Sequence, residues 1–484
     1  MSNGGYIEDK ELYFLTVILS IIFVYQLIKI SSMIHYFPLN GFLDGLSYMT
    51  RLYFLAEYGY HNFVPNWHEG FFILKHYAPG WFFFTLPIYW LTKNIVLSSF
   101  ISMLLSYILG LIFFLILRKS QKLSLAKSLA FFLIFYLSPS AFSDFFFLGR
   151  LTDLFSFVFL ILGFALIYKK REWDSYWIFL FFSLYTLMLL NQSSVVILYS
   201  FLVLGLLLTL GLKERILIIT SIIISLILTS FWWIPFLDNK GTILENFKAI
   251  GFNNYFSYGT IISMIFLISF FFFWISKNRN KRDLLFYSPS LILVFLYATR
   301  IVSLIPLLNN IWANSYNLFF TFLAIFFIFK TNFNLKVKKF VVFGIYLIPL
   351  FVIVISFIYP IKSFEYNETQ RGIISLFPNT TNRVLIVPSE KVDVSGKALI
   401  AYGTIYYNLT TPDGWQTSSV SPELYQKLKF VQKTVSERNC NEIESKLEEL
   451  KVEQVFAIGD KCQIFLDCGF KISMENEDAC LIKI

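Results

Sequence analysis

The chain has 484 residues, 57% of them hydrophobic and 15% charged, and its mean hydropathy is +0.65. This composition excludes a soluble globular protein, because apolar runs longer than the ~18 residues that can cross a bilayer recur along the sequence. The net charge of +9 does not indicate a nucleic-acid partner, because the basic residues cluster in short connectors between apolar runs, as the positive-inside rule describes for cytoplasmic loops.

The first apolar segment, residues 12–30, is predicted to remain in the membrane as a signal anchor. The residues before it lack a basic region, and no small-residue cleavage site follows it. Residues 31–93 form a polar and aromatic loop, predicted to lie at the outer face of the membrane. Within this loop, the Pro-broken stretch 79–91 is short for a span, so we interpret it as re-entrant or interfacial.

Residues 43–58 have the pattern of a helix lying in the membrane interface. Its i, i+4, i+7, i+11 spacing places four side chains on one face. They are Asp44, Tyr48, Arg51 and Leu55.

The remaining spans follow from the positions of the basic connectors. The connectors 118–122, 169–172, 213–215, 277–282 and 330–339 are taken as cytoplasmic. The spans after the first are then 94–117, 124–138, 151–168, 173–190, 194–212, 216–237, 258–276, 284–304, 312–329 and 340–359. The sequence thus predicts about eleven spans, a cytoplasmic N-terminus and an outer C-terminus.

The composition changes after the last span, so residues 1–360 are predicted to form the transmembrane bundle and residues 361–484 an extracytoplasmic α/β domain. Alternating and β-rich runs predict strands, and amphipathic patterns predict helices. The predicted strands are 383–388, 397–407, 454–459 and 479–484, and the predicted helices are 422–435 and 440–452.

All of the cysteines and three N-x-S/T sequons fall in this C-terminal region. The cysteines are Cys440, Cys462, Cys468 and Cys480, and the sequons are at Asn367, Asn379 and Asn408. An even number of cysteines in one compartment favours disulfides, and a sequon accepts a glycan only outside the cytoplasm. A zinc site is the alternative, but the spacing lacks a CxxC knuckle.

Candidate chemistry centres on the first outer loop, where the histidines of the chain also collect. Asp44 is placed to act as a general base toward a hydroxyl, or as a metal ligand beside His68 and Glu69. In the alternative interpretation, Asp44 caps its helix, Arg51 reaches phospholipid headgroups, and the histidines bind no ligand.

A second candidate cluster contains Asp144, Gly149, Arg150 and Asp153 on the next outer turn. A guanidinium forms a bidentate fork to phosphoryl oxygens, so Arg150 is a candidate for binding a lipid phosphate. The alternative is an ordinary ion pair with Asp153, three residues on. Arg300, at another outer span end, is a weaker phosphate candidate because a charge there normally snorkels.

Several phrases in the first loop and the turn after it resemble the C-type glycosyltransferase superfamily. They are FLAEYG (54–59), WHEG (67–70), HYAPGWFFF (76–84) and GRLTDLFSF (149–157). The chain is most similar to archaeal multi-pass proteins labelled as related to 6-pyruvoyl-tetrahydropterin synthase, with Thr152 and Asp153 where that group has Pro and Glu. The first loop lacks a DxD motif, and the C-terminal region lacks the WWDYG motif of oligosaccharyltransferases.

The resemblance implies an inverting transferase of the plasma membrane. Its donor would be a polyprenyl-phosphate-linked sugar at the outer leaflet, and its acceptor would be a surface glycan, lipid or protein. Asp44 would be its catalytic base or the carboxylate of a metal site. The cation at such a site would be Mg²⁺ or Mn²⁺. Two alternatives stay open, namely a non-catalytic scaffold or surface-assembly protein of the same fold, and a transporter or ligase of lipid-linked oligosaccharide. The sequence contains no Walker loop, GxGxxG, GxSxG or HExxH motif that would support another common chemistry.

Overall fold

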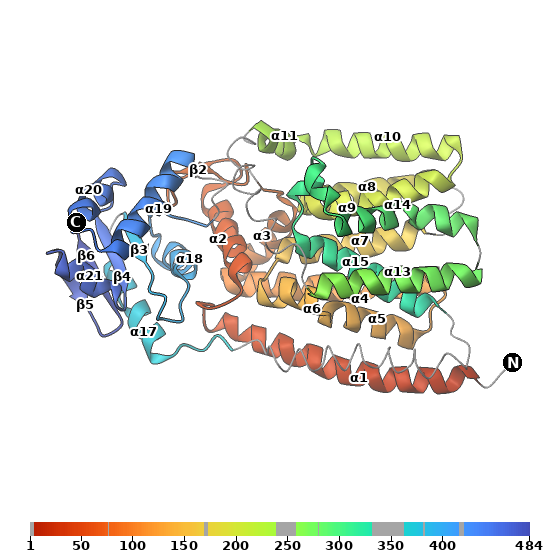
Figure 1. Ribbon diagram of the computed structural model, residues 1–484, viewed down its shortest axis with the longest axis horizontal. Helices are drawn as coiled ribbons and strands as arrows, with labels where there is room; N and C mark the ends of the chain where they lie inside the picture. The colour runs from red at the N-terminus through yellow and green to blue at the C-terminus, as the bar shows by residue number, and fades with distance from the viewer. Residues whose placement is uncertain are drawn as a thin grey trace.

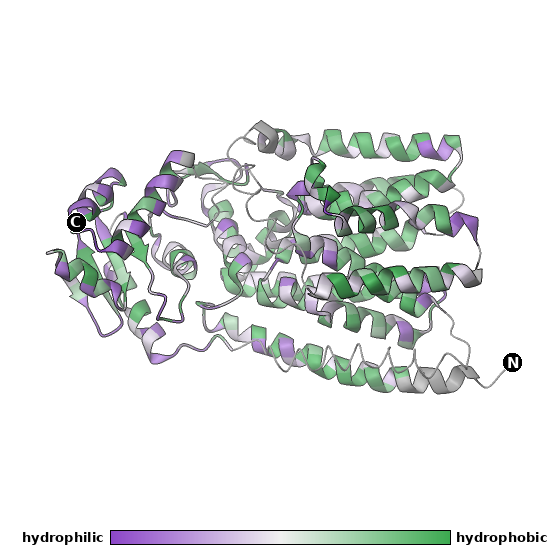
Figure 2. Cartoon of the chain, in the orientation of Figure 1, coloured by the Kyte–Doolittle hydropathy of each residue, from purple (hydrophilic) through white to green (hydrophobic). Residues whose placement is uncertain are grey.

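The computed structural model describes residues 4–75, 77–168, 173–238, 258–278, 280–331, 363–380, 383–415 and 421–484. It shows a bundle of long helices and, at one end of the bundle, a smaller part that contains a β-sheet (Figure 1). The bundle is predominantly hydrophobic along its length, whereas hydrophilic residues are interspersed throughout the smaller part (Figure 2). The predicted boundary at residue 360 lies outside the described residues.

The helices of the bundle run side by side along its long axis (Figure 1). They are α1 (Gly4–Ser31), α4 (Ile95–Gln121), α5 (Leu125–Leu137), α7 (Leu151–Ile167), α8 (Ser175–Asn191), α9 (Ser193–Thr209), α10 (Leu212–Leu228), α11 (Ser230–Asp238), α13 (Tyr258–Asn278), α14 (Lys281–Ala298) and α15 (Ala313–Lys330). Each span predicted before residue 331 overlaps one of these helices, with α10 and α11 together covering 216–237. The span predicted at 284–304 is too long, because α14 ends at Ala298. The last predicted span, 340–359, lies outside the described residues.

Among the described residues, four helices are long and apolar enough to cross a membrane, namely Leu12–Ile34, Ile95–Gln121, Gly259–Ser276 and Ala313–Lys330. A fifth span results if α5 and the segment Pro139–Phe147 are counted together across a bend of 49°. The bend falls at Pro139, which has no amide hydrogen with which to continue the helix. The other apolar helices are shorter, as in α7, α8 and α9. The chain is therefore a polytopic membrane protein.

The first loop lies at the end of the bundle that faces the smaller part. Its interfacial helix is α2 (Leu43–Tyr58), which has the predicted bounds. A short hairpin follows, β1 (Phe63–Val64) with β2 (Phe71–Phe72), and then α3 (Gly80–Thr92). The 13 residues of α3 are too few for a span, and they pack against α4 near the end of the bundle.

The smaller part contains a four-stranded sheet in the order β3-β4-β6-β5. Its strands are β3 (Val384–Val387), β4 (Gln454–Ile458), β5 (Lys471–Glu475) and β6 (Ala479–Lys483). Strands β3 and β4 are parallel, and the other neighbours are antiparallel. Its helices are α17 (Glu368–Ser375), α18 (Gly396–Tyr407), α19 (Pro422–Glu437), α20 (Cys440–Glu449) and α21 (Lys461–Asp467).

One predicted strand of this part is a helix. Residues 397–407 were expected to be extended, but they form α18. An apolar run of this length does not by itself distinguish a buried strand from a buried helix. In the structure, α18 packs on α2 of the first loop and on β3. The run is therefore buried as a helix between the two parts of the chain and does not join the sheet.

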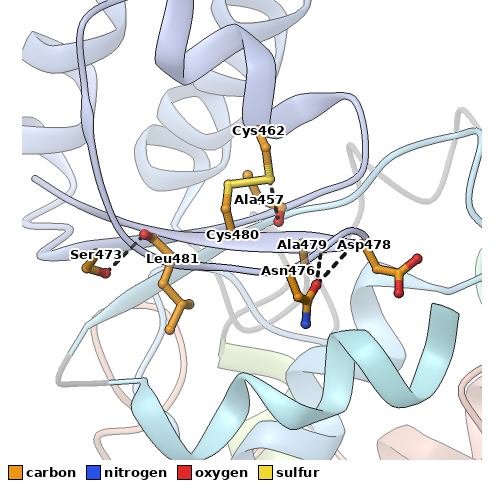
Figure 3. Close-up of a disulfide and its surroundings, with 8 residues drawn as sticks. All are labelled: Ala457, Cys462, Ser473, Asn476, Asp478, Ala479, Cys480 and Leu481. Carbon is orange, nitrogen blue, oxygen red and sulfur yellow. Dashed lines mark hydrogen bonds between the residues drawn. A yellow bond between two sulfur atoms is a disulfide. The ribbon is translucent and has the colours of Figure 1, made fainter. Parts of the chain in front are cut away.

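Two disulfides use all of the cysteines. Cys440–Cys468 joins the start of α20 to the end of α21, with a Cα–Cα distance of 5.0 Å, and Cys462–Cys480 joins α21 to β6 at 5.9 Å. Figure 3 shows the second bridge beside the β5–β6 turn, where the Asn476 side chain accepts hydrogen bonds from two backbone amides. The predicted disulfides are therefore present, and no thiolate is left for the alternative zinc site.

The first loop connects the bundle to the smaller part through buried polar side chains. Trp67 Nε1 donates to Thr404 Oγ1 on α18 at 2.9 Å. Asn66 accepts from the Tyr58 hydroxyl at 2.6 Å and donates to Asn408 Oδ1 at 2.8 Å. Both Asn66 and Trp67 are buried. The hairpin segment is thus a structural joint between α2 and α18.

Candidate functional site

Four elements bring charged and polar side chains together at the end of the bundle. Asp44 is in the first turn of α2, Arg150 is the N-cap residue of α7, Asp144 is in the π-helical segment η2 (Phe142–Phe147), and Asn314 is in the first turn of α15. Arg150 Nε donates to Asp44 Oδ2 at 2.8 Å, and Arg150 Nη1 lies 3.5 Å from Asp144 Oδ1. Asn314 Nδ2 donates to the same Asp144 oxygen at 2.8 Å. We call this group the Arg150 cluster.

The backbone around Phe42 holds α2 against the turn that carries Arg150. The Phe42 amide donates to the Phe147 carbonyl at 2.9 Å, and the Gly45 amide to the Leu148 carbonyl at 3.1 Å. The buried Phe42 ring occupies the space where Gly45 and Gly149 would each carry a Cβ atom. Gly149 also has a φ of +70°, which side-chain-bearing residues rarely adopt. Two glycines therefore allow the close approach that brings Asp44 to Arg150.

The members of the Arg150 cluster differ in how far their side chains are exposed. The side chain of Asp144 is fully buried and that of Arg150 is 9% exposed, whereas the side chain of Asp44 is 35% exposed. The Trp312 ring packs against the Arg150 guanidinium at 5.2 Å. Asp44 is thus the most exposed carboxylate of the cluster, whereas Arg150 and Asp144 are enclosed.

The rest of the predicted face of α2 packs inward. The Tyr48 hydroxyl accepts from the hydroxyls of Tyr77 at 3.1 Å and Thr152 at 3.2 Å. Arg51 is buried and lies 4.3 Å from the centre of the Tyr77 ring. The interpretation that Arg51 reaches lipid headgroups is therefore wrong. Capping by Asp44 is also wrong, because the N-cap residue of α2 is Phe42, and Asp44 lies inside the first turn.

The alternative interpretation, an ion pair between Arg150 and Asp153, is not found in the structure. The close ion pairs of Arg150 are with Asp44 and Asp144, and not with Asp153 on its own helix. Asp153 lies in the first turn of α7 and is buried there. Arg150 therefore pairs with carboxylates of two other elements, Asp44 on α2 and Asp144 on η2, and not with one on its own helix.

His68 and Glu69 are not in the Arg150 cluster. The His68 ring is 2% exposed and lies beside the Lys397–Asp413 ion pair of the smaller part, whereas Glu69 is exposed. Burial lowers the pKa of His68 to about 4, although the Asp413 carboxylate partly opposes this shift. Within the described residues, no group of three or more His, Cys, Asp or Glu side chains is arranged to hold a metal ion.

The remaining candidate residues lie apart from one another. Arg300 precedes the short helix η3 (Ile301–Leu304) and is exposed, and Asp44 and Asp144 pair with Arg150 and not with it. The sequon asparagines are exposed, and Asn367 caps α17. Sequence reasoning missed Asn314 and Trp312 because no local pattern connects the start of α15 with residue 150. The Lys397–Asp413 pair was missed because the run containing Lys397 was assigned to a strand.

Comparison with solved structures identifies the fold. The chain is similar to the arabinofuranosyltransferase AftD from Mycobacteria, with a TM-score of 0.55 and 11% identity over 91% of this chain and 35% of that one. It is also similar to the Archaeoglobus fulgidus oligosaccharyltransferase in its apo form, with a TM-score of 0.52 and 10% identity over 92% of this chain and 69% of that one. No family model and no curated protein matches the sequence.

The fold is therefore C-type glycosyltransferase-like, with a helical membrane bundle followed by a small C-terminal part with a sheet. The chain spans about a third of the length of AftD. The narrower likeness, to archaeal proteins labelled as related to 6-pyruvoyl-tetrahydropterin synthase, is not tested by these comparisons and stays a prediction.

Proposed function

We propose that this protein is a membrane glycosyltransferase that moves a sugar from a polyprenyl-phosphate carrier to a surface glycan, lipid or protein. One observation carries the proposal, namely that the partly exposed Asp44 carboxylate is held by Arg150 at the end of the bundle, in a chain with a glycosyltransferase-like fold. The reaction would take place at the outer leaflet of the plasma membrane, with the N-terminus cytoplasmic and the C-terminal part outside.

Asp44 would act as the general base. It accepts the proton of the acceptor hydroxyl while that oxygen bonds to the anomeric carbon, and the bond from this carbon to the phosphate oxygen breaks. The leaving group is the polyprenyl phosphate, and the configuration inverts. A base must be accessible and correctly oriented. The exposure of Asp44 meets the first need, and the hydrogen bond from Arg150 Nε meets the second.

Arg150 would act as a positioning residue in this reaction. Its guanidinium is engaged by Asp44 and Asp144, so a donor phosphate would have to compete with both carboxylates. Phosphate binding by Arg150 or Arg300 stays a prediction. The described residues do not fit a divalent cation held by His68 and Glu69, because His68 is buried in the joint and Glu69 is exposed. The proposed reaction therefore uses Asp44 and Arg150 and assigns no role to a cation.

The test is deletion of the gene followed by mass spectrometry of surface glycans and lipid-linked sugars. We expect one sugar to be missing from a surface acceptor and its lipid-linked donor to accumulate. Wild type should restore the glycan, and Asp44→Asn should not, although it keeps the size of the side chain. Glu57→Gln, on an exposed position of the same helix, is the matched control and should restore it.

Other outcomes assign the alternatives. Unchanged glycans after deletion contradict the transferase and favour a scaffold of the same fold. Lipid-linked sugars accumulating only on the cytoplasmic side would favour a transporter. Full rescue by Asp44→Asn would retain the transferase and remove Asp44 as its base.

A further inference from the structure

A pocket lies where the first loop meets the smaller part of the chain, and none of its lining residues belongs to the Arg150 cluster. It has a volume of 240 Å³. Its polar lining comes from the first loop, from the segment around α18 and from one face of α19. These residues are His68, Lys397, Asp413, Tyr425, Lys429 and Gln432. We call it the joint pocket.

The floor of the joint pocket is built by a close packing of His68 on Gly414. A Cβ atom on Gly414 would lie 2.7 Å from the His68 ring and 3.0 Å from Trp67 Cβ, so only glycine allows this contact. Lys397 Nζ lies 2.6 Å from Asp413 Oδ1 and also donates to the Gly414 carbonyl. The Gly414 amide in turn donates to Asp413 Oδ1 at 2.7 Å. The Lys397 ammonium, the Asp413 carboxylate and the Gly414 backbone are therefore held by one another.

The opposite wall is the face of α19 that carries Tyr425, Lys429 and Gln432. Lys429 Nζ lies 4.5 Å from the centre of the Tyr425 ring. The side chain of Tyr425 is partly buried, and those of Lys429 and Gln432 are exposed. On this side the Lys429 ammonium lies over the Tyr425 ring, and the Gln432 amide lines the same pocket.

The lining suits a group that both donates and accepts hydrogen bonds. Asp413 accepts, Lys429 donates, and Gln432 does both. Lys397 is already neutralised by Asp413, so the pocket does not present the concentrated positive charge that an anion such as phosphate requires. Sugar hydroxyls both donate and accept hydrogen bonds, as this lining requires.

The size of the joint pocket limits its occupant. At 240 Å³ it is smaller than the ~300–1,000 Å³ of sites for drug-sized ligands, so it accommodates one ring and not an extended chain. We propose that the joint pocket binds a single sugar unit of a glycan. This inference deepens the proposed function, because a second sugar-binding position outside the Arg150 cluster would hold the acceptor glycan or the growing product.

The test uses the full-length protein in detergent and saturation-transfer NMR. The probes are the methyl glycosides of glucose, galactose, mannose and N-acetylglucosamine, with inorganic phosphate as the anionic probe. We expect transfer to at least one glycoside. Gln432→Ala should weaken its binding about fivefold, and Asp413→Asn about tenfold, as the loss of a neutral and of a charged hydrogen bond. Thermal denaturation establishes that each variant is folded.

Gln426→Ala is the matched control, since Gln426 is also an exposed glutamine of α19 but does not line the pocket. It should bind as wild type does, and so should Asp44→Asn. The proposal is overturned if no glycoside binds, if only phosphate binds, or if Gln432→Ala and Asp413→Asn both leave binding unchanged. None of these results depends on glycan transfer, so failure of the transferase in the deletion experiment remains distinguishable from failure of the joint pocket.

Discussion

Arg150 Nε donates to Asp44 Oδ2 at 2.8 Å, across a sequence separation of 106 residues. This bond joins the first turn of α2, in the first loop, to the start of α7, in the bundle. Its two partners differ in exposure, since the arginine is enclosed and the aspartate is open to one side. The first loop and the bundle are thus connected at Asp44, the carboxylate that we propose as the general base.

Replacing Arg150 should destabilise the bundle more than replacing Asp44. Arg150→Ala leaves the fully buried Asp144 without its cation, and removing one partner of a buried pair costs about 3–5 kcal/mol. Asp44→Asn should cost less than ~1 kcal/mol, because its carboxylate is partly exposed and screened. Denaturation of the full-length protein in detergent measures both. Equal losses for the two variants would contradict the expectation that the buried Asp144 depends on Arg150 more than the partly exposed Asp44 contributes.

Gly149 should not tolerate alanine. Gly149→Ala adds a Cβ atom 2.7 Å from the Phe42 ring at a φ of +70°, so we expect a loss of about 2–3 kcal/mol from overpacking and backbone strain together. Gly41→Ala is the control in the same region, since Gly41 has a φ of +76° but nothing within 4 Å of the added atom. It should show only the strain, about 1 kcal/mol.

A second substitution separates the two contributions at Gly149. Phe42→Ala removes the ring that the new Cβ atom would meet, so Gly149→Ala should cost less in that background than in wild type. Additive losses in the double variant would show that strain alone is responsible. Thermal midpoints of the four proteins, measured in one detergent, complete the cycle.

Acid should destabilise the joint through His68. The pKa of His68 is lowered to about 4 in the folded chain, against about 6.5 in an unfolded one. Between these values the unfolded chain binds the proton and the folded chain does not, so stability falls as the pH is lowered from 6.5 to 4. The full effect is about 3 kcal/mol.

Measurement of that pH dependence needs a variant that cannot titrate. His68→Gln should remove this part of the acid sensitivity and leave the contribution of the carboxylates. The quantity to compare is the change in unfolding free energy from pH 7.5 to pH 4 in wild type and variant. Parallel curves for the two proteins would mean that folding does not lower the pKa of His68.

The disulfide pairing should appear in peptides from the non-reduced protein. We expect Cys440 linked to Cys468 and Cys462 linked to Cys480, and no other pair. Replacing both Cys440 and Cys468 by Ser should destabilise the smaller part by about 3–4 kcal/mol. The reason is that the unfolded chain gains conformational entropy when residues 28 positions apart are no longer linked. Mass spectrometry of proteolytic fragments identifies the pairs, and a crossed pairing would contradict this arrangement.

Local patterns predicted much of this architecture. Apolar runs located the bundle helices, and the amphipathic pattern of residues 43–58 located α2 with its bounds. The same reasoning failed at α18, because an apolar run carries no information about what will cover it. It also failed to connect Asn314 with Asp144, since that contact depends on how α15 lies against η2.

The sequence by itself determined that the chain is a membrane protein, where its helices lie, and that Asp44 and Arg150 are candidates for chemistry. These properties follow from composition, periodicity and residue type, all of which are local. Only the tertiary structure decided that Asp44 and Arg150 form one cluster while His68 belongs to the joint with the smaller part. The physical reason is that the partner of a buried charge is the nearest group in space, and packing, including the contact of Phe42 with two glycines, sets which group that is.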